Sequence, residues 1–154
     1  MSTGKVLQSQ SYTLLICLFG SFRVLQGPNA TPVAVGGKAA ELLCQLALRH
    51  ERPISREQLL DALWPEADPM LAGQSFNNLV SVLRRLFKDA LAGAPLLLHS
   101  GRYYQLNVEA GVDVDVACFD RLTEEGERYS RAGRLEVAVA HYRRAVALYH
   151  GDLC

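Results

Sequence analysis

The sequence predicts an α+β fold, in which β-rich segments and amphipathic helices occupy separate blocks of the 154 residues. Short β-rich segments separated by glycine turns occur near the N-terminus and again in the middle of the chain. Between and behind them, apolar residues recur with the period of a helix. We therefore expect an N-terminal antiparallel sheet, then three helices closed by a β-hairpin, and finally an all-α helical hairpin.

The composition is that of a globular protein. Hydrophobic residues make up 49% and charged residues 21%, and 16 basic residues balance 16 acidic ones. This balance excludes a strongly basic coat for nucleic acid, but it allows a local basic face. No apolar run approaches the roughly 20 residues that cross a bilayer, so no membrane partner is expected. The four cysteines are widely spaced, which predicts reduced thiols in a cytoplasmic protein.

The N-terminal sheet is predicted from three short segments. Residues 1–12 are polar and are expected to form a flexible N-terminus. Thr13–Phe19 and Phe22–Gln26 are β-rich and are separated by a Gly-Ser pair, which is a hairpin signal. A turn rich in glycine, proline and asparagine then leads to a third strand, Pro32–Val35.

Three helices follow. The first, Lys38–His50, has apolar residues at helical spacing. The second, Ser55–Trp64, begins with a capping box, and Leu63 and Trp64 at its end are expected to be buried against the third helix. The third, Pro69–Ala90, has an aspartate N-cap and proline at its first position. Its apolar side carries Phe76, Leu79, Val80, Leu83, Leu86 and Phe87.

A β-hairpin is predicted after the third helix, from Leu96–His99 and Tyr103–Val108 with its turn at Gly101. Three helices followed by a hairpin are the element order of a winged helix-turn-helix. In that fold the last helix enters the major groove of DNA, and the hairpin, or wing, reaches an adjacent groove or the backbone. The alternative is a protein-interaction domain in which the polar face of the third helix is only solvated.

The polar face of the third helix and the wing tip contain the candidate DNA-binding residues. Arg85 lies near the centre of this face and is expected to contact a base edge or a nearby phosphate. Arg84 is expected to contact phosphate, and Asn78 is the best amide for an adenine edge. Arg102, at the wing tip, is expected to contact the backbone or the minor groove. The full predicted set is Gln74, Asn77, Asn78, Ser81, Arg84, Arg85, Lys88 and Arg102.

Several motifs resemble those of a known family. Ser81 followed by Leu83–Phe87 is similar to the end of the recognition helix in OmpR-type winged helices. Leu63–Pro65, the wing segment Gly101–Tyr104 and the preceding N-terminal sheet also fit that type. The opening segment Leu18–Val24 and the helical region behind the wing resemble the SARP/AfsR class more specifically. In that class a winged helix is followed by a bacterial transcriptional activator domain.

The sequence departs from the OmpR type at several surface positions. Gln74, Ser81 and Val82 stand where the recognition helix is often basic, and Ser100 stands where an arginine is common in the wing. Tyr103 replaces a glycine that is usual in the wing turn. Fewer basic residues mean fewer of the phosphate contacts that dominate affinity for DNA. These departures favour the alternative interpretation, in which the winged helix is a protein-interaction module.

The C-terminal region, residues 110–154, resembles the start of an activator domain. The segment Asp113–Phe119 matches the D-x-x-x-F entry of that domain, and helices are predicted over Val114–Arg131 and Leu135–Tyr149. A single tetratricopeptide repeat cannot bury its own outer face, so we expect this region to be the first part of a longer array of repeats. The alternative is a generic helical hairpin. The positions that match a tetratricopeptide-like repeat are Leu122, Gly126, Tyr129, Ala138, Tyr142 and Ala145.

The resemblance implies a sequence-specific bacterial transcription regulator, with a DNA-binding domain at residues 13–109 and the activator domain behind it. Double-stranded DNA is the expected partner, and recruitment of RNA polymerase is implied by the resemblance alone. The helical domain would mediate signalling or oligomerisation, for example as a homodimer. No HExxH, GxSxG or phosphate-loop motif is present, so we expect no enzyme, no cofactor and no metal.

Overall fold

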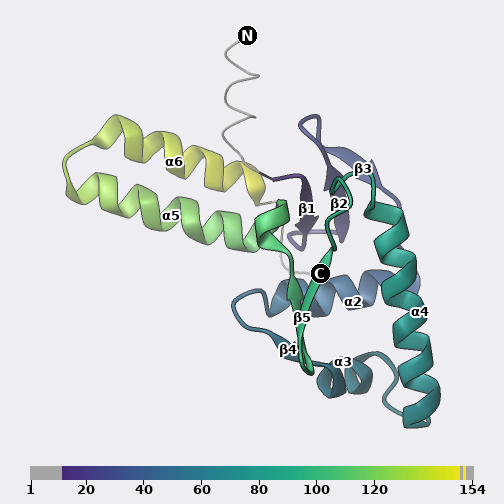
Figure 1. The fold of residues 1–154 in the computed structure, drawn as a ribbon. Helices are drawn as coiled ribbons and strands as arrows, with labels where there is room; N and C mark the ends of the chain where they lie inside the picture. Colours follow the sequence, from purple (N-terminus) through teal and green to yellow (C-terminus); the bar gives the residue numbers. More distant parts are fainter. Residues whose placement is uncertain (1–11, 150, 152–154) are drawn as a thin grey trace.

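The computed structural model describes residues 12–149 and 151, so nearly all of the predicted flexible segment 1–12 lies outside the described residues. Helices and strands follow one another in the predicted order, and a short 3-10 turn and a further strand precede the last two helices (Figure 1). The elements are β1 (Leu14–Cys17), β2 (Arg23–Gln26), β3 (Thr31–Val33), α2 (Gly37–Leu48), β4 (Ile54–Ser55), α3 (Arg56–Leu63), α4 (Pro69–Phe87), β5 (Leu97–Ser100), β6 (Tyr103–Leu106), η1 (Val108–Ala110), β7 (Val112–Val114), α5 (Asp115–Arg131) and α6 (Leu135–Leu148).

The N-terminal sheet has the strand order β3-β2-β1-β7. The first three strands are antiparallel, with Leu15 opposite Leu25 in the β1–β2 pair. Strand β7, however, runs parallel to β1, with Ile16 opposite Val114. The three predicted strands are therefore antiparallel as expected, and β7 is a fourth, parallel strand that the sequence did not predict. The reason is that β1 and β7 are far apart in the sequence, and no local turn signal announces a parallel pair.

The three predicted helices and the hairpin form one core with the sheet. A second sheet, with the order β4-β6-β5, contains the wing, and β4 connects it to the start of α3. Figure 1 shows α3 between the wing tip and the beginning of α4. The largest side chains buried at the centre are Phe76 and Phe87 of α4, together with leucines from β1, α2 and α3.

The predicted helix starts are confirmed by their caps. The Ser55 hydroxyl accepts a hydrogen bond from the Gln58 N–H at 3.1 Å, and the Gln58 side chain accepts one from the Ser55 N–H at 3.2 Å. At the start of α4, Asp68 accepts a hydrogen bond from the Leu71 N–H at 3.4 Å. Helix α4 ends earlier than predicted, at Phe87, and the chain then turns through a residue with positive φ at Ala92.

Two predicted core positions differ in the structure. Leu63 is buried as expected, but Trp64 is only partly buried because it is the C-cap of α3 and its backbone has left the helical conformation. Leu86 is 45% exposed. At 100° per residue, Leu86 points about 80° away from the direction shared by Leu83 and Phe87, so it lies on the flank of α4.

Helices α5 and α6 form the predicted tetratricopeptide-like hairpin, which extends away from the sheet (Figure 1). Leu122, Ala138 and Ala145 are buried between the helices. Gly126 is also buried, and a Cβ atom added to it would lie only 2.8 Å from Cε1 of Tyr142. A glycine is therefore needed here for the two helices to approach as closely as they do.

We expect Gly126→Ala to destabilise the chain by about 1–3 kcal/mol, because the added methyl group overpacks the contact with the Tyr142 ring. Urea unfolding followed by circular dichroism measures this change. Ser130→Ala, an exposed substitution in the same helix, is the control and should stay within about 0.5 kcal/mol of the original chain. Equal unfolding midpoints for both variants would show that the helices have room to separate.

The helical hairpin is joined to the sheet through a buried carboxylate. Asp115, the first residue of α5, is only 1% exposed. Its two oxygens accept hydrogen bonds from the backbone N–H groups of Leu18 at 2.9 Å and Phe19 at 3.0 Å. The predicted domain boundary near residue 109 stays a prediction, but the sheet itself continues to Val114.

Candidate nucleic-acid interface

Helix α4 has one buried face and one exposed face. Ala72, Phe76, Leu83 and Phe87 are buried against the core. The opposite face is open to solvent, and it contains all the residues of α4 and its C-cap that the sequence nominated: Gln74, Asn77, Asn78, Ser81, Arg84, Arg85 and Lys88. The separation of polar from apolar residues predicted for this helix is therefore present on its surface.

The angle between α3 and α4 is held by Arg56, which sequence reasoning did not identify. Its guanidinium donates to the carbonyl oxygen of Gly73 at 3.2 Å and lies 4.8 Å from the ring centroid of Phe76. The packing is close, because a Cβ atom at Gly73 would lie 3.2 Å from Nη2 of Arg56. No sequence pattern could reveal this contact, since it joins two helices whose crossing angle is set by the whole core.

The structure distinguishes the two neighbouring asparagines. Oδ1 of Asn77 accepts a hydrogen bond from Nη1 of Arg56 at 3.1 Å. Asn78 lies one position further around the helix and is exposed. The side-chain oxygen of Asn77 thus already has a partner within the protein, whereas the amide of Asn78 faces solvent. Asn78 is the stronger candidate for contact with an adenine edge.

The wing turns where the sequence predicts. Gly101 has a φ of +60°, a left-handed conformation that glycine adopts without strain. The following residue, Arg102, forms an exposed ion pair with Glu57 of α3, with Nη1 and Oε1 3.2 Å apart. The backbone also connects the two elements, because the Arg56 N–H donates to the Arg102 carbonyl oxygen at 2.7 Å. The wing tip is therefore held beside the start of α3.

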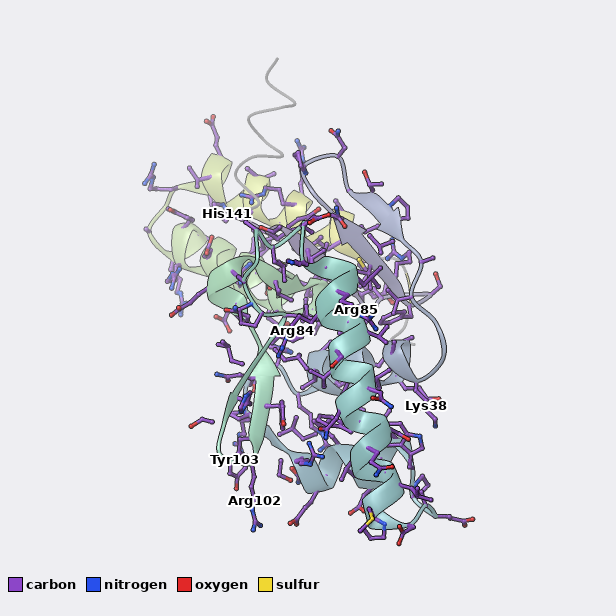
Figure 2. All side chains as sticks on the ribbon, turned by 45° about the vertical axis from the view of Figure 1, so that its right-hand side comes forward. Lys38, Arg84, Arg85, Arg102, Tyr103 and His141 are labelled. Atoms are coloured by element: carbon purple, nitrogen blue, oxygen red, sulfur yellow. The ribbon has the colours of Figure 1, made fainter. Side chains whose placement is uncertain are left out.

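The candidate residues form two groups along the surface. Figure 2 shows Arg102 and Tyr103 at the wing tip, while Arg84 and Arg85 lie on the part of α4 far from that tip. The amide residues Gln74 and Asn78 belong to the first half of α4. Positive charge is thus gathered at the end of α4 and at the wing tip, with uncharged polar groups between them.

Exposed apolar side chains lie on the flank of α4, at the border of the polar face, and in its first turn. Val82 is 46% exposed and Leu86 45% exposed, one helical turn apart, and Met70 and Leu71 are exposed in the first turn of α4. Among the described residues there is no cluster of histidine, cysteine, aspartate or glutamate that could hold a metal ion. In the same part of the chain, no helix is both long and apolar enough to cross a membrane.

A three-helix unit with an exposed polar helix and a wing defines the winged-helix class of proteins, and here a helical hairpin is appended to it. Two family models match the chain. "Transcriptional regulatory protein, C terminal" matches residues 30–105, and "Bacterial transcriptional activator domain" matches residues 114–154. The chain belongs to the SARP family of bacterial transcriptional regulators, which combine these two domains.

Named relatives agree with this assignment. Regulatory protein DnrI of Streptomyces peucetius is 30% identical over 136 residues, which cover 82% of this chain and 47% of DnrI. Transcriptional regulatory protein EmbR of Mycobacterium tuberculosis is 30% identical over 127 residues, which cover 81% of this chain and 32% of EmbR. The present chain therefore spans half or less of the length of these relatives.

A solved structure has the same fold. Mycobacterium tuberculosis EmbR in complex with a low-affinity phosphopeptide superposes with a TM-score of 0.73 and 28% sequence identity. The match covers 92% of this chain and 37% of the EmbR chain. The likeness therefore extends over the winged helix and the helical hairpin together.

Proposed function

We propose that this chain is the DNA-binding part of a sequence-specific transcriptional activator. The observation that carries the proposal is the exposed polar and basic face of α4, which lies opposite the buried apolar face. A helix presented in this way fits the major groove of DNA, and the residues nearest its start are the ones that reach base edges in related motifs.

The structure supports a division of roles on this surface. Gln74, Asn78 and Ser81 lie on the outer face of the helix and carry groups that hydrogen-bond to base edges. Arg85 lies at the centre of the face around the helix axis but in the last turn along it, and we assign it to a guanine edge or a nearby phosphate. The remaining members, Asn77, Arg84, Lys88 and Arg102, are assigned to positioning and phosphate contact.

The proposal extends to the partners and the domains. Residues 13–109 form the DNA-binding domain and residues 110–154 begin the activator domain, in a protein that works in the cytoplasm. The helical domain would contact RNA polymerase or a second copy of the protein. Exposed apolar side chains on α6, at Leu135, Val139 and Val146, support a role in association.

A protein-interaction module that no longer binds DNA is the second candidate function. Two observations favour it. The ion pair with Glu57 reduces the positive charge that Arg102 offers to phosphate. In addition, Val82 and Leu86 present apolar surface on the helix that would have to enter the groove.

We expect Arg85→Ala and Arg84→Ala to weaken DNA binding in different ways. If Arg85 contacts a base edge, its loss costs about 1–3 kcal/mol on a selected duplex and relaxes the preference at one base pair. Loss of a phosphate contact at Arg84 or Arg102 weakens binding to all sequences alike. It also lowers by about one the steepness with which the logarithm of the binding constant falls with the logarithm of the salt concentration. Titration of each variant on a selected and a random duplex at two salt concentrations measures both effects.

Arg131→Ala is the matched control, because Arg131 is an exposed arginine at the end of α5, away from the proposed interface. It should bind like the original chain. Absence of salt-dependent binding to any duplex would favour the interaction module. Binding that none of the three interface substitutions changes would reject the assignment of the DNA-binding face.

A further inference from the structure

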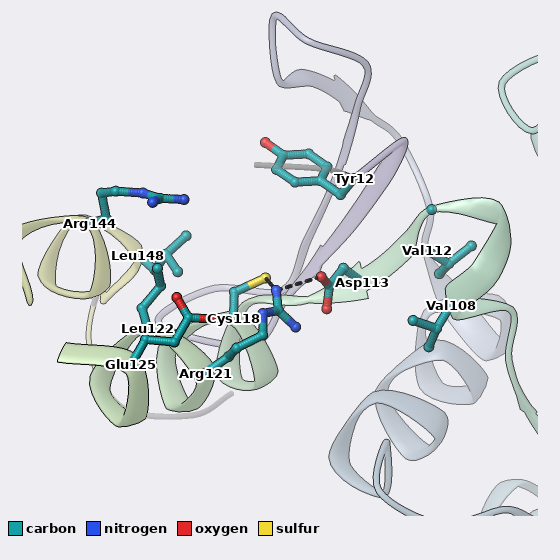
Figure 3. A pocket seen from close by; sticks show the side chains of 11 residues that line it. Tyr12, Val108, Val112, Asp113, Cys118, Arg121, Leu122, Glu125, Arg144 and Leu148 are labelled. Atoms are coloured by element: carbon teal, nitrogen blue, oxygen red, sulfur yellow. Dashed lines mark hydrogen bonds and ion pairs between the residues drawn. The ribbon is translucent and has the colours of Figure 1, made fainter. Parts of the chain in front are cut away.

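A cavity of about 360 Å³ lies between the edge of the N-terminal sheet and the helical hairpin. Its walls come from β7, α5 and α6, together with Tyr12 just before β1 (Figure 3). Both its volume and its position between two structural units are typical of sites for small molecules. None of the candidate DNA-binding residues lines it, so its role is separate from the interface on α4.

Most of the charged groups that line the cavity already have partners. Nη2 of Arg121 lies 3.0 Å from Oδ2 of Asp113, and Oε2 of Glu125 lies 3.0 Å from Nε2 of His141. The thiol of Cys118 adds no charge, because burial and the neighbouring Asp113 carboxylate raise its pKa to about 12. The paired acidic groups therefore offer little attraction for a cation.

Arg144 of α6 is the exception among the charged residues of the cavity. Its Nε atom is buried and has no hydrogen-bond partner among the described residues, and none of their ion pairs includes this side chain. In Figure 3 its guanidinium points into the space between α6 and Tyr12. A buried donor without a partner is unfavourable, so a ligand that accepts its hydrogen bond is bound more tightly.

We propose that this cavity binds a small organic anion, a carboxylate or a phosphomonoester with an apolar body, whose acidic group pairs with Arg144. The guanidinium fork of arginine matches both kinds of anion in geometry and charge. Leu122, Leu148 and Val112 provide the apolar wall against which the body of the ligand packs. The hydroxyl of Tyr12 stays protonated, since burial raises its pKa, and so it can donate a further hydrogen bond.

Such a ligand would contact both structural units at once. Val112 belongs to the N-terminal sheet, whereas Arg144 and Leu148 belong to the last helix of the hairpin. Binding would therefore stabilise the position of the hairpin on the winged helix. The proposal does not depend on DNA binding, and its test uses no DNA.

The test is an NMR titration of the 154-residue chain with 2-naphthoate, 2-naphthyl phosphate and the neutral analogue 2-naphthol. We expect at least one of the two anions, at millimolar concentration or below, to shift the methyl resonances of Val112, Leu122 and Leu148. Binding of naphthoate would identify a carboxylate ligand and binding of the phosphate a phosphomonoester. Arg144→Gln should weaken anion binding about tenfold or more.

Arg143→Gln is the matched control, because Arg143 is the preceding residue of the same helix but is exposed and does not line the cavity. It should bind the anions as the original chain does. The proposal is overturned if neither anion shifts these resonances, if 2-naphthol binds as tightly as the anions, or if Arg144→Gln leaves their affinity unchanged. The comparison with 2-naphthol needs no variant. It tests whether binding requires the negative charge of the ligand, even where Arg144→Gln alters the fold.

Discussion

Replacing Asp115 with alanine should destabilise the chain by about 2–5 kcal/mol, because its buried carboxylate satisfies backbone groups that have no other partner available. Leu18 and Phe19 are buried, and their N–H groups both donate to this side chain. A third hydrogen bond, from the Val116 N–H at 2.8 Å, connects the same carboxylate to the first turn of α5. The substitution therefore leaves two buried donors unsatisfied and detaches the start of the helix from β1.

Chemical unfolding followed by tryptophan fluorescence and by circular dichroism measures this loss. Asp120→Ala is the control, because Asp120 is an exposed carboxylate in the same helix, and it should change the stability by no more than about 0.5 kcal/mol. If Asp115→Ala and Asp120→Ala unfold at the same denaturant concentration, water or backbone rearrangement must satisfy the two donors, and Asp115 does not hold the hairpin to the sheet.

Phe76→Ala should cost about 3–5 kcal/mol, since a fully buried aromatic side chain is removed from the centre of the winged helix. Its ring lies 5.2 Å from the ring of Tyr104 in the wing and 4.8 Å from the guanidinium of Arg56. The substitution therefore leaves a cavity at the point where α3, α4 and the wing meet. The loss of this ring also removes the surface on which Arg56 rests.

The melting temperature of Phe76→Ala can be compared with that of Gln74→Ala, an exposed substitution on the same helix. A chain of this size should melt several degrees lower for each kcal/mol lost. Phe76→Leu serves as a second variant, because it keeps most of the apolar volume and should recover a large part of the stability. A melting temperature for Phe76→Ala equal to that of Gln74→Ala would contradict the assignment of Phe76 to the core.

The sequence by itself determined the local structure of this protein. The serine and glutamine of the capping box predicted the start of α3, and Gly101 predicted the turn of the wing; both are confirmed. The apolar period of α4 predicted which side faces the core, apart from Leu86. These features could be read because caps, tight turns and helical periods depend on residues only a few positions apart.

The tertiary structure alone decided how these elements are connected. The parallel pairing of β7 with β1, the burial of Asp115 and the contact of Arg56 with Asn77 all join residues distant in the sequence. The cavity around Arg144 likewise exists only because a strand and two helices meet there. Such contacts depend on the packing angles of whole elements, and a single sequence carries no local signal for them.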